Sequence, residues 1–323
     1  MNKPIAIIAG EPNSISSEII FKSWLLRKKF KNRLFLIIGS IDLLKSQRKK
    51  LNFEIDIKKI NSNFEIKDLK SNKLPVFDIK YLQKKPFEKI SNKSNKYIFS
   101  CFDIALKLVK TKKVVGFINC PVSKESLFVK KHQGITEFLS KKLGRNGKEV
   151  MLIFNKNLSV SPITTHIPFK NVSKNIKKSK IISNVKTIND FYVKIFNKKP
   201  HFGILGLNPH NYSSLKNNEE KIIIKKAILK LKKLKYNVSG PIQTDSSFMN
   251  FKKFKFDVII GMYHDQVLTP FKALFRYKAI NITLGLPYIR ISPDHGVAEN
   301  IMGEKKANPE SLIESIKFYN YIK

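Results

Sequence analysis

Three histidines, His166, His210 and His264, each come just after an apolar run of strand length. Imidazole binds zinc and related divalent ions, and three protein ligands with one open position are typical of a catalytic metal site. Asp265 directly follows His264, and its carboxylate could orient neighbouring metal ligands through hydrogen bonds without binding the metal itself. The spacings of these histidines form no local motif. Three unrelated loop histidines that make ordinary hydrogen bonds therefore remain the alternative interpretation.

Apolar segments of strand length alternate with stretches of helical period, which predicts an α/β fold with a largely parallel sheet. The predicted strands are residues 5–9, 34–39, 114–118, 150–154, 202–207, 258–262 and 280–283. The predicted helices are residues 18–30, 97–109 and 219–235, and residues 48–92 give mixed signals. Function gathers beyond the carboxyl ends of the strands in open α/β sheets. The polar clusters after these strands are therefore expected to build one site.

The chain carries 62 Lys and Arg against 24 Asp and Glu, a formal net charge of +38. Such a balance favours nucleic acid as a partner. The basic residues are spread along the whole chain, however, and form no single tail or stripe. We therefore expect no specific nucleic acid, although a basic nucleic-acid-binding protein remains the alternative from a different class. A positive field would in either case attract anionic substrates.

The two cysteines, Cys101 and Cys120, have no CxxC spacing and indicate neither a disulfide framework nor a zinc knuckle. The apolar run at residues 5–10 is too short for the core of a signal peptide, and no later run is long enough to span a bilayer. We expect a cytoplasmic protein with no membrane partner.

Several motifs resemble those of the 4-hydroxythreonine-4-phosphate dehydrogenases, enzymes of vitamin B6 (pyridoxine) biosynthesis. The most specific block comprises Gly261-Met262-Tyr263-His264-Asp265-Gln266, Lys272, Asn281-Ile282-Thr283-Leu284-Gly285-Leu286-Pro287, Ile289-Arg290 and Asp294-His295-Gly296. Further matches in the same order are Pro121-Val122-Ser123-Lys124, Gly134-Ile135-Thr136-Glu137-Phe138-Leu139, Thr165-His166-Ile167-Pro168 and Gly206-Leu207-Asn208-Pro209-His210. The resemblance runs from Gly10 to about Asn308, nearly the whole chain.

The resemblance implies a two-lobed α/β subunit similar to isocitrate and isopropylmalate dehydrogenases, with the active site in the cleft between the lobes. Residues 1–130 and 285–323 would form the lobe that carries the cofactor loop. Residues 131–284 would form the second lobe, with the metal ligands and the dimer contacts. The family further implies a homodimer with a shared active site.

The resemblance also assigns roles to individual residues. It implies that His166, His210 and His264 bind a divalent metal (zinc, magnesium or cobalt), with His264 contributed by the other subunit. It implies that the substrate is contacted by Thr136, Lys272, Asn281 and Arg290. Asp245 would line the pocket, and a metal-bound water, Asp245 or a lysine such as Lys272 could act as the general base.

Two of the implied anion-binding residues can also be judged from the chain itself. Arginine binds phosphate and carboxylate bidentately, and lysine pairs with them as a point charge. Arg290 stands between Ile289 and Ile291, where a purely solvated role is disfavoured. Lys272 taken alone would be read as a solvated surface charge in so basic a chain.

The closing segment from Asp294 to Asn308 resembles the cofactor loop of the isocitrate and isopropylmalate dehydrogenases. This implies NAD, or NADP, held by His295, Gly296 and Asn308 without a GxGxxG fingerprint, and the chain has no such fingerprint. An ordinary turn is the alternative interpretation of His295 and Gly296. The implied reaction is a metal-dependent oxidation of 4-(phosphooxy)-L-threonine, followed by loss of CO2.

The chain departs from the family pattern at three places. Ile135 stands where the family has a histidine before Thr136, which removes a hydrogen-bond donor on the phosphate side. The loop 211–216 has no glycine, and Ser14 and Ser16 replace glycines near the amino terminus. The alternative is therefore a related dehydrogenase that acts on another phosphorylated hydroxy acid, such as 4-phosphoerythronate.

Overall fold

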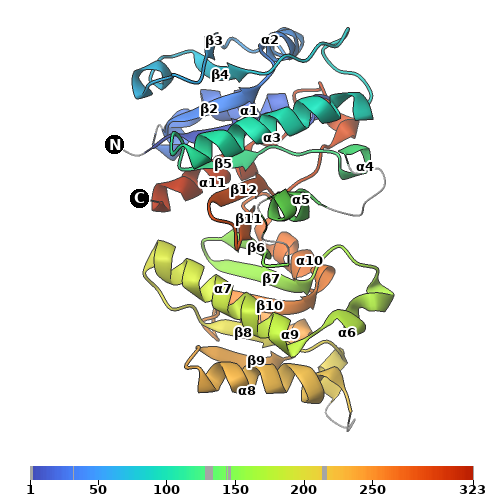
Figure 1. The fold of residues 1–323 in the computed structure, drawn as a ribbon. Coiled ribbons are helices and arrows are strands. Elements are labelled where there is room, and N and C mark those ends of the chain that lie inside the picture. Colours follow the sequence, from blue (N-terminus) through green and yellow to red (C-terminus); the bar gives the residue numbers. More distant parts are fainter. Residues whose placement is uncertain are drawn as a thin grey trace. The chain divides into compact units, whose positions relative to one another are not determined.

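The computed structural model describes residues 3–31, 33–127, 134–142, 144, 147–212 and 217–322. The chain divides into two compact units, each described here by itself (Figure 1). Unit 1 combines Met1–Leu139 with Leu286–Lys323, and unit 2 is Ser140–Gly285. The lobe boundary predicted near residue 130 lies outside the described residues. The predicted contents of the two lobes stay a prediction.

The described strands of unit 1 form a parallel sheet in the order β3-β4-β2-β1-β5-β12. The central strands are continuous apolar runs because helices cover both of their faces. The strands are β1 (Ile5–Ile8), β2 (Phe35–Gly39), β3 (Ile57–Ile60), β4 (Leu74–Asp78), β5 (Gly116–Asn119) and β12 (Ile289–Pro293).

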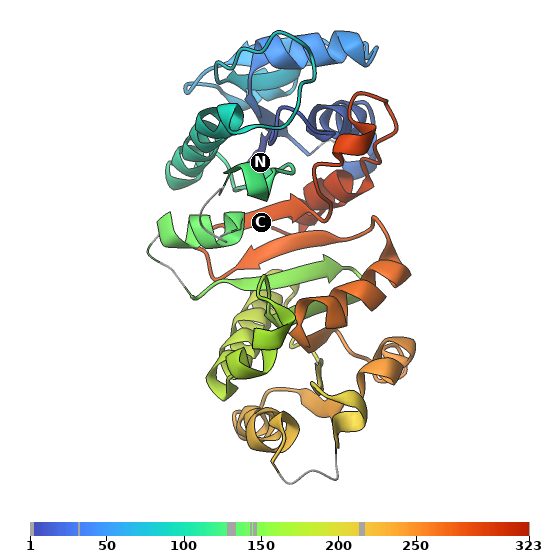
Figure 2. The ribbon, with the colours of Figure 1, turned by 90° about the vertical axis from the view of Figure 1, so that its right-hand side faces the viewer.

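One face of this sheet is covered by α3, whose residues Ile98, Cys101, Phe102 and Ala105 are buried at helical spacing. Figure 2 shows α1 and α11 on the opposite face of the unit 1 sheet. The helices are α1 (Ser16–Leu25), α2 (Ile41–Lys50), α3 (Asn95–Lys110), α4 (Lys124–Leu127), α5 (Ile135–Lys142), which continues into unit 2, and α11 (Glu310–Phe318). Short helical turns are η1 (Arg27–Phe30), η2 (Ile66–Leu69), η3 (Asn92–Ser94), η7 (Glu299–Ile301) and η8 (Tyr319–Tyr321).

The described strands of unit 2 lie in the order β11-β6-β7-β10-β8-β9. β6 pairs antiparallel with β7 and β11, whereas β7, β10, β8 and β9 run parallel. The strands are β6 (Val150–Asn155), β7 (Leu158–Thr164), β8 (Phe202–Leu205), β9 (Val238–Ile242), β10 (Val258–Tyr263) and β11 (Ile280–Leu284).

Helices also cover both faces of the unit 2 sheet, with α7 on one side and α10 on the other (Figure 2). The helices are α6 (Val172–Asn175), α7 (Lys178–Phe196), α8 (Lys225–Lys233), α9 (Thr244–Asn250) and α10 (His264–Phe275). Short helical segments are η4 (Phe169–Asn171), η5 (Pro209–Tyr212) and η6 (Glu220–Ile224).

The predicted α/β fold is confirmed, and each predicted strand coincides with an observed one to within a few residues. The helix predicted at 18–30 is shorter, because α1 ends at Leu25 and the chain continues in the tighter turns of η1. Among the described residues, no helix is both long and apolar enough to cross a membrane.

Candidate active site

His166 and His264 are brought together by the pairing of two parallel strands. β7 lies beside β10 with Thr164 opposite Tyr263, so the residues that follow the two strand ends are neighbours. The ring centroids of His166 and His264 are 5.9 Å apart. His264 Nδ1 lies 2.6 Å from Asp265 Oδ1. When Nδ1 donates to this carboxylate, the lone pair of Nε2 remains for a metal or a proton.

His210 and Asp245 line a cavity of about 710 Å³ in unit 2, together with Asn208, Tyr263 and Gln266. His210 has a left-handed backbone, with φ 50° and ψ 19°, and its side chain is exposed. Asp245 lies in the first turn of α9, where its Oδ1 accepts a hydrogen bond from the Ser246 amide. The cavity thus collects the loops after β8, β9 and β10.

The imidazoles of this unit suit a divalent metal in their chemistry, since imidazole nitrogen is a common zinc ligand and Asp265 fixes one ring. Within the described part of one chain, however, no group of three or more His, Cys, Asp or Glu is placed to hold a metal ion. One chain brings His166 and His264 together and places His210 on the cavity wall. The imidazoles of His166 and His264 could supply two ligands of a metal site, which would need at least one further ligand.

Gln266, a residue of the matched block to which we assigned no role, holds three of these segments together. Its Oε1 accepts from the Met262 amide at 2.6 Å. Its Nε2 donates to the Gly206 carbonyl at 2.7 Å and to Thr244 Oγ1 at 2.9 Å. Gln266 is buried and therefore fixes the ends of β8 and β10 and the start of α9 relative to one another.

The loop that carries His210 is also fixed by the buried carboxylate of Glu220. Glu220 Oε1 accepts from the amides of Leu207 at 2.8 Å and Asn208 at 2.7 Å. The rest of this loop, residues 213–216, where the chain departs from the family, lies outside the described residues.

The other predicted unit 2 residues lie on separate elements. Lys272 is exposed on α10, two turns after His264, and Asn281 is in β11 opposite Ile153. Neither is among the residues that line the 710 Å³ cavity. The Asn281 Oδ1 is buried and accepts no hydrogen bond within the described structure.

In unit 1, Arg290 and Thr136 come together as expected for two residues that bind the same anion. Arg290 lies in β12, which pairs with β5, and its side chain is only 3% exposed. Its Nε donates to Asn119 Oδ1 at 2.7 Å, and its Nη1 donates to Thr136 Oγ1 at 3.3 Å. Asn119 ends β5 and had no assigned role. Its position as the first polar residue after an apolar strand was the signal for it.

Ile135 belongs to the hydrophobic core under α3, together with Leu127 and Leu139, and is 4% exposed. The side chain that replaces the family's histidine therefore fills apolar space. The missing donor beside the anion stays a prediction, and the burial adds that an imidazole at this position would need a polar partner in the core.

Gly296 lies in a second cavity, of about 680 Å³, in unit 1. Ser123, Lys124, Val297 and Glu299 share its wall. A Cβ built on Gly296 would have no atom within 4 Å, so the glycine leaves open space on the cavity side. This open backbone and the cation of Lys124 fit the approach of a phosphorylated cofactor.

The two remaining cofactor residues have local partners. His295 Nδ1 lies 3.1 Å from the Gly296 carbonyl oxygen. Asn308 Oδ1 accepts from the Glu310 amide at the start of α11. The loop before Asn308 is held by the buried Glu18, whose Oε1 accepts from the Ala307 amide at 2.7 Å.

Glu11 follows β1 at the carboxyl edge of the same sheet. Gly10 adopts φ 78°, and a Cβ there would lie 2.5 Å from the Pro121 carbonyl oxygen, so the turn requires glycine. The Glu11 side chain is buried and accepts from Ser94 Oγ at 3.2 Å. Burial raises the pKa of Glu11 to about 7.

Paired imidazoles in one unit, and a buried arginine against a threonine in the other, suit an α/β enzyme that acts on small anionic substrates. Comparison with known proteins specifies the family. Residues 31–319 match the family described as "Pyridoxal phosphate biosynthetic protein PdxA", and the chain belongs to this family. The predicted family membership, and with it the prediction of an oxidoreductase, is confirmed.

Individual relatives agree along nearly the whole chain. The chain is 37% identical over 317 residues to the 4-hydroxythreonine-4-phosphate dehydrogenase of Sulfurihydrogenibium sp. (strain YO3AOP1), covering 97% of this chain and 96% of the relative. The crystal structure of a 4-hydroxythreonine-4-phosphate dehydrogenase from Klebsiella pneumoniae matches with a TM-score of 0.82 and 26% identity, over 99% of both chains. A relative from Oceanobacillus iheyensis with the provisional name D-threonate 4-phosphate dehydrogenase is 29% identical over 320 residues, 97% of this chain and 96% of the relative.

Proposed function

We propose that the protein oxidises 4-(phosphooxy)-L-threonine with NAD to 2-amino-3-oxo-4-(phosphooxy)butanoate, in pyridoxal 5'-phosphate biosynthesis. The product then loses CO2 to give 3-amino-2-oxopropyl phosphate. The observation that carries the proposal is the partly buried hydrogen bond from Arg290 to Thr136, in a chain whose relatives bear the name of this dehydrogenase. A guanidinium beside a hydroxyl suits the phosphate or the carboxylate of such a substrate.

The assignment of the other residues follows the same proposal. His166, His210 and His264 would hold a divalent metal (zinc, magnesium or cobalt), which supplies a positive charge that polarises a hydroxyl oxygen. NAD, or NADP, accepts the hydride and would be bound by His295, Gly296 and Asn308.

The chain's own side chains would bind the substrate and move its proton. Arg290, Thr136, Lys272 and Asn281 would bind and orient the phosphate and the carboxylate of the substrate. Asp245, or Lys272 as the alternative, would accept the proton of the C3 hydroxyl. NAD, when bound, would take the two electrons of the C3–H bond as hydride, and the electron pair of the broken O–H bond would form the C3 carbonyl.

A second candidate substrate is favoured by Ile135. The apolar core position leaves Thr136 and Arg290 without the family's neighbouring imidazole, and the Oceanobacillus relative is named for a different phosphorylated acid. A related phosphorylated hydroxy acid, such as D-threonate 4-phosphate or 4-phosphoerythronate, is therefore the alternative.

The deciding experiment measures NADH formation from each of these three acids with added zinc, magnesium or cobalt, before and after chelation. We expect 4-(phosphooxy)-L-threonine to give the highest kcat/KM and the chelator to abolish turnover. Arg290→Ala should lower kcat/KM about 10²-fold, because an ion pair to the substrate is lost, and should change the KM for NAD little. A higher kcat/KM with either other acid would transfer the assignment to that acid, and turnover that resists chelation would remove the metal.

The cellular location and the assembly belong to the same proposal. We place the enzyme in the cytoplasm as a homodimer, and the free, buried state of Cys101 and Cys120 agrees with a reducing compartment.

A further inference from the structure

A third cavity, of about 470 Å³, lies in unit 1 at the end of the sheet opposite Glu11 and Asn119. Its wall comes from the segments that precede β1, β2, β5 and β12, which meet at one edge because these strands are parallel. Four of its lining residues are basic, namely Lys3, Arg33, Lys110 and Lys112. Most of the remaining wall is made of valine, proline and isoleucine side chains. The cavity thus combines an apolar interior with concentrated positive charge.

Arg33 is the buried charge of this cavity, with 7% of its surface exposed. Its Nη2 donates to the Lys3 carbonyl at 2.9 Å. Its Nε and Nη1 are buried and make no hydrogen bond within the described structure. Burial lowers the pKa of this guanidinium, which expresses the cost of holding a cation there without an anion. Two buried donors without an acceptor, on a residue that lines this cavity, favour an anionic ligand here.

Tyr288 adds a third donor to the same wall. Its ring packs against Phe117 with centroids 5.4 Å apart, which fixes the side chain. Its hydroxyl is buried without a partner in the described structure. Burial raises the pKa of Tyr288 above its usual value, so the hydroxyl keeps its proton and can donate it in a hydrogen bond.

We propose that this cavity is a second anion site, which binds the phosphate group of a small phosphate monoester with an apolar or aromatic body. A phosphate accepts several charge-assisted hydrogen bonds at once, as the donors of Arg33 and Tyr288 require. The three lysines add charge from two separate segments. The volume lies in the range of small-molecule sites and exceeds what a bare phosphate fills, so the apolar wall has room for an organic body.

The test is a calorimetric titration of the full chain with phenyl phosphate, inorganic phosphate and benzoate at about 0.15 M salt, where nonspecific surface attraction is screened. The variants are Arg33→Met, which keeps the side-chain length, and Tyr288→Phe, which keeps the ring. Lys230→Gln on α8 is the matched control, because it removes one exposed charge from unit 2.

We expect Arg33→Met to lower the affinity for phenyl phosphate at least about tenfold, and Tyr288→Phe to lower it several-fold. Lys230→Gln should bind phenyl phosphate as the unmodified protein does. Phenyl phosphate should bind more tightly than inorganic phosphate. Equal binding by Arg33→Met and Lys230→Gln would refute the site. Benzoate binding as tightly as phenyl phosphate would refute the assignment to phosphate.

A Thr136→Val variant distinguishes binding at the Arg33 cavity from binding at the proposed substrate residues. The binding of phenyl phosphate that depends on Arg33 should persist in this variant. Arg33→Met should fold, because removing a buried cation without an anion is not expected to destabilise the protein, and its melting temperature checks this. If Arg33→Met does not fold, Tyr288→Phe is compared with Lys230→Gln instead, and equal binding of phenyl phosphate by these two variants would refute the site. Arg33→Met should keep the dehydrogenase kcat/KM within about twofold, because the cavity is separate from the proposed active site. Absence of turnover in the unmodified protein would therefore count against the proposed reaction and not against this anion site.

Discussion

Glu11 lies at the carboxyl end of β1 with 1% of its surface exposed, and its burial raises its pKa from 4.5 to about 7. The folded protein therefore holds a proton on Glu11 in a pH window where the unfolded chain has released it. The contribution of Glu11 to stability is fully present below about pH 4.5 and is lost as the pH rises through about 7.

We predict that Glu11→Gln removes this loss, since glutamine does not ionise. The stability of the variant relative to the unmodified protein should rise between pH 4 and pH 8 by about 3 kcal/mol at most. Urea unfolding at a series of pH values measures it. Glu54→Gln is the control, because Glu54 is exposed, and should show no such trend. A stability difference for Glu11→Gln that stays constant with pH would contradict the account.

At the scale of residues, the sequence indicated the strand-end positions better than the hydrogen bonds between them. Arg290 could be singled out because two isoleucines flank it. Asn119 could be noted as a polar residue at a strand end, but its contact with Arg290 could not be predicted, because it depends on the pairing of β5 with a strand from the far end of the chain. The burial of Ile135 was equally invisible, since an isoleucine next to a threonine does not reveal which way the helix faces.

Among the elements, β8, β10 and α9 depend on one side chain for their mutual position. Gln266 makes three hydrogen bonds to their ends, and the loops that follow β8 and β10 carry His210 and His264. Replacing it with leucine would leave a buried amide and a buried carbonyl without partners.

We predict that Gln266→Leu destabilises the protein by about 2–5 kcal/mol. We also expect zinc affinity to fall about 10- to 100-fold, because the loops that carry the histidines lose their support. Thermal unfolding and zinc titration measure the two effects. Gln243→Leu is the control, since Gln243 is exposed and directly precedes α9. Unchanged zinc affinity in a destabilised Gln266→Leu would limit the role of this residue to folding.

The elements that were not predicted have physical reasons for escaping notice. β3 reads Ile-Lys-Lys-Ile because it is an edge strand with partly exposed side chains. β9 contains Gly240-Pro241, a pair that ordinarily indicates a turn. α7 was recoverable, since Ile181, Val185, Ile188 and Tyr192 follow helical spacing.

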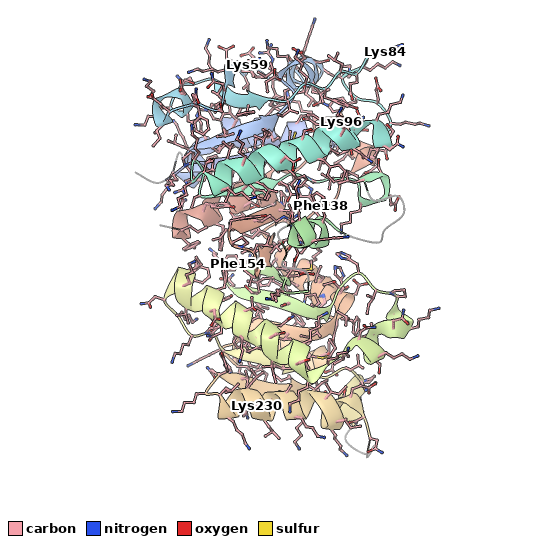
Figure 3. All side chains as sticks on the ribbon, in the orientation of Figure 1. Lys59, Lys84, Lys96, Phe138, Phe154 and Lys230 are labelled. Atoms are coloured by element: carbon pink, nitrogen blue, oxygen red, sulfur yellow. The ribbon has the colours of Figure 1, made fainter. Side chains whose placement is uncertain are left out.

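At the scale of the whole molecule, positive charge is distributed over both units. Figure 3 shows lysine side chains extending from the elements of each, including Lys59, Lys96 and Lys230. Dispersed charge gives a general positive field that attracts anionic substrates, and it does not outline a groove for a nucleic acid.

The proposed dimer allows a test of how the metal ligands are shared. The rings of His166 and His264 lie close together within one chain, whereas the family resemblance assigns His264 to the partner's site. We predict that a mixed dimer of His166→Ala and His264→Ala subunits is active, because one of its two shared sites then keeps both histidines. Each variant alone should be inactive. Coexpression with two affinity tags isolates the mixed dimer, and an inactive mixed dimer would show that both ligands come from one chain.

The composition of unit 1 from two distant stretches of chain affects the order in which the nascent protein can fold on the ribosome. Unit 2 is one continuous stretch and can form its sheet as soon as residue 285 has left the exit tunnel. The unit 1 sheet is completed only after β12 has been made, although its first strand is among the earliest residues made. Arg290 therefore reaches Asn119 and Thr136 only near the end of translation, so a chain terminated before residue 290 would contain the three histidines proposed as metal ligands but not the arginine proposed to bind the substrate.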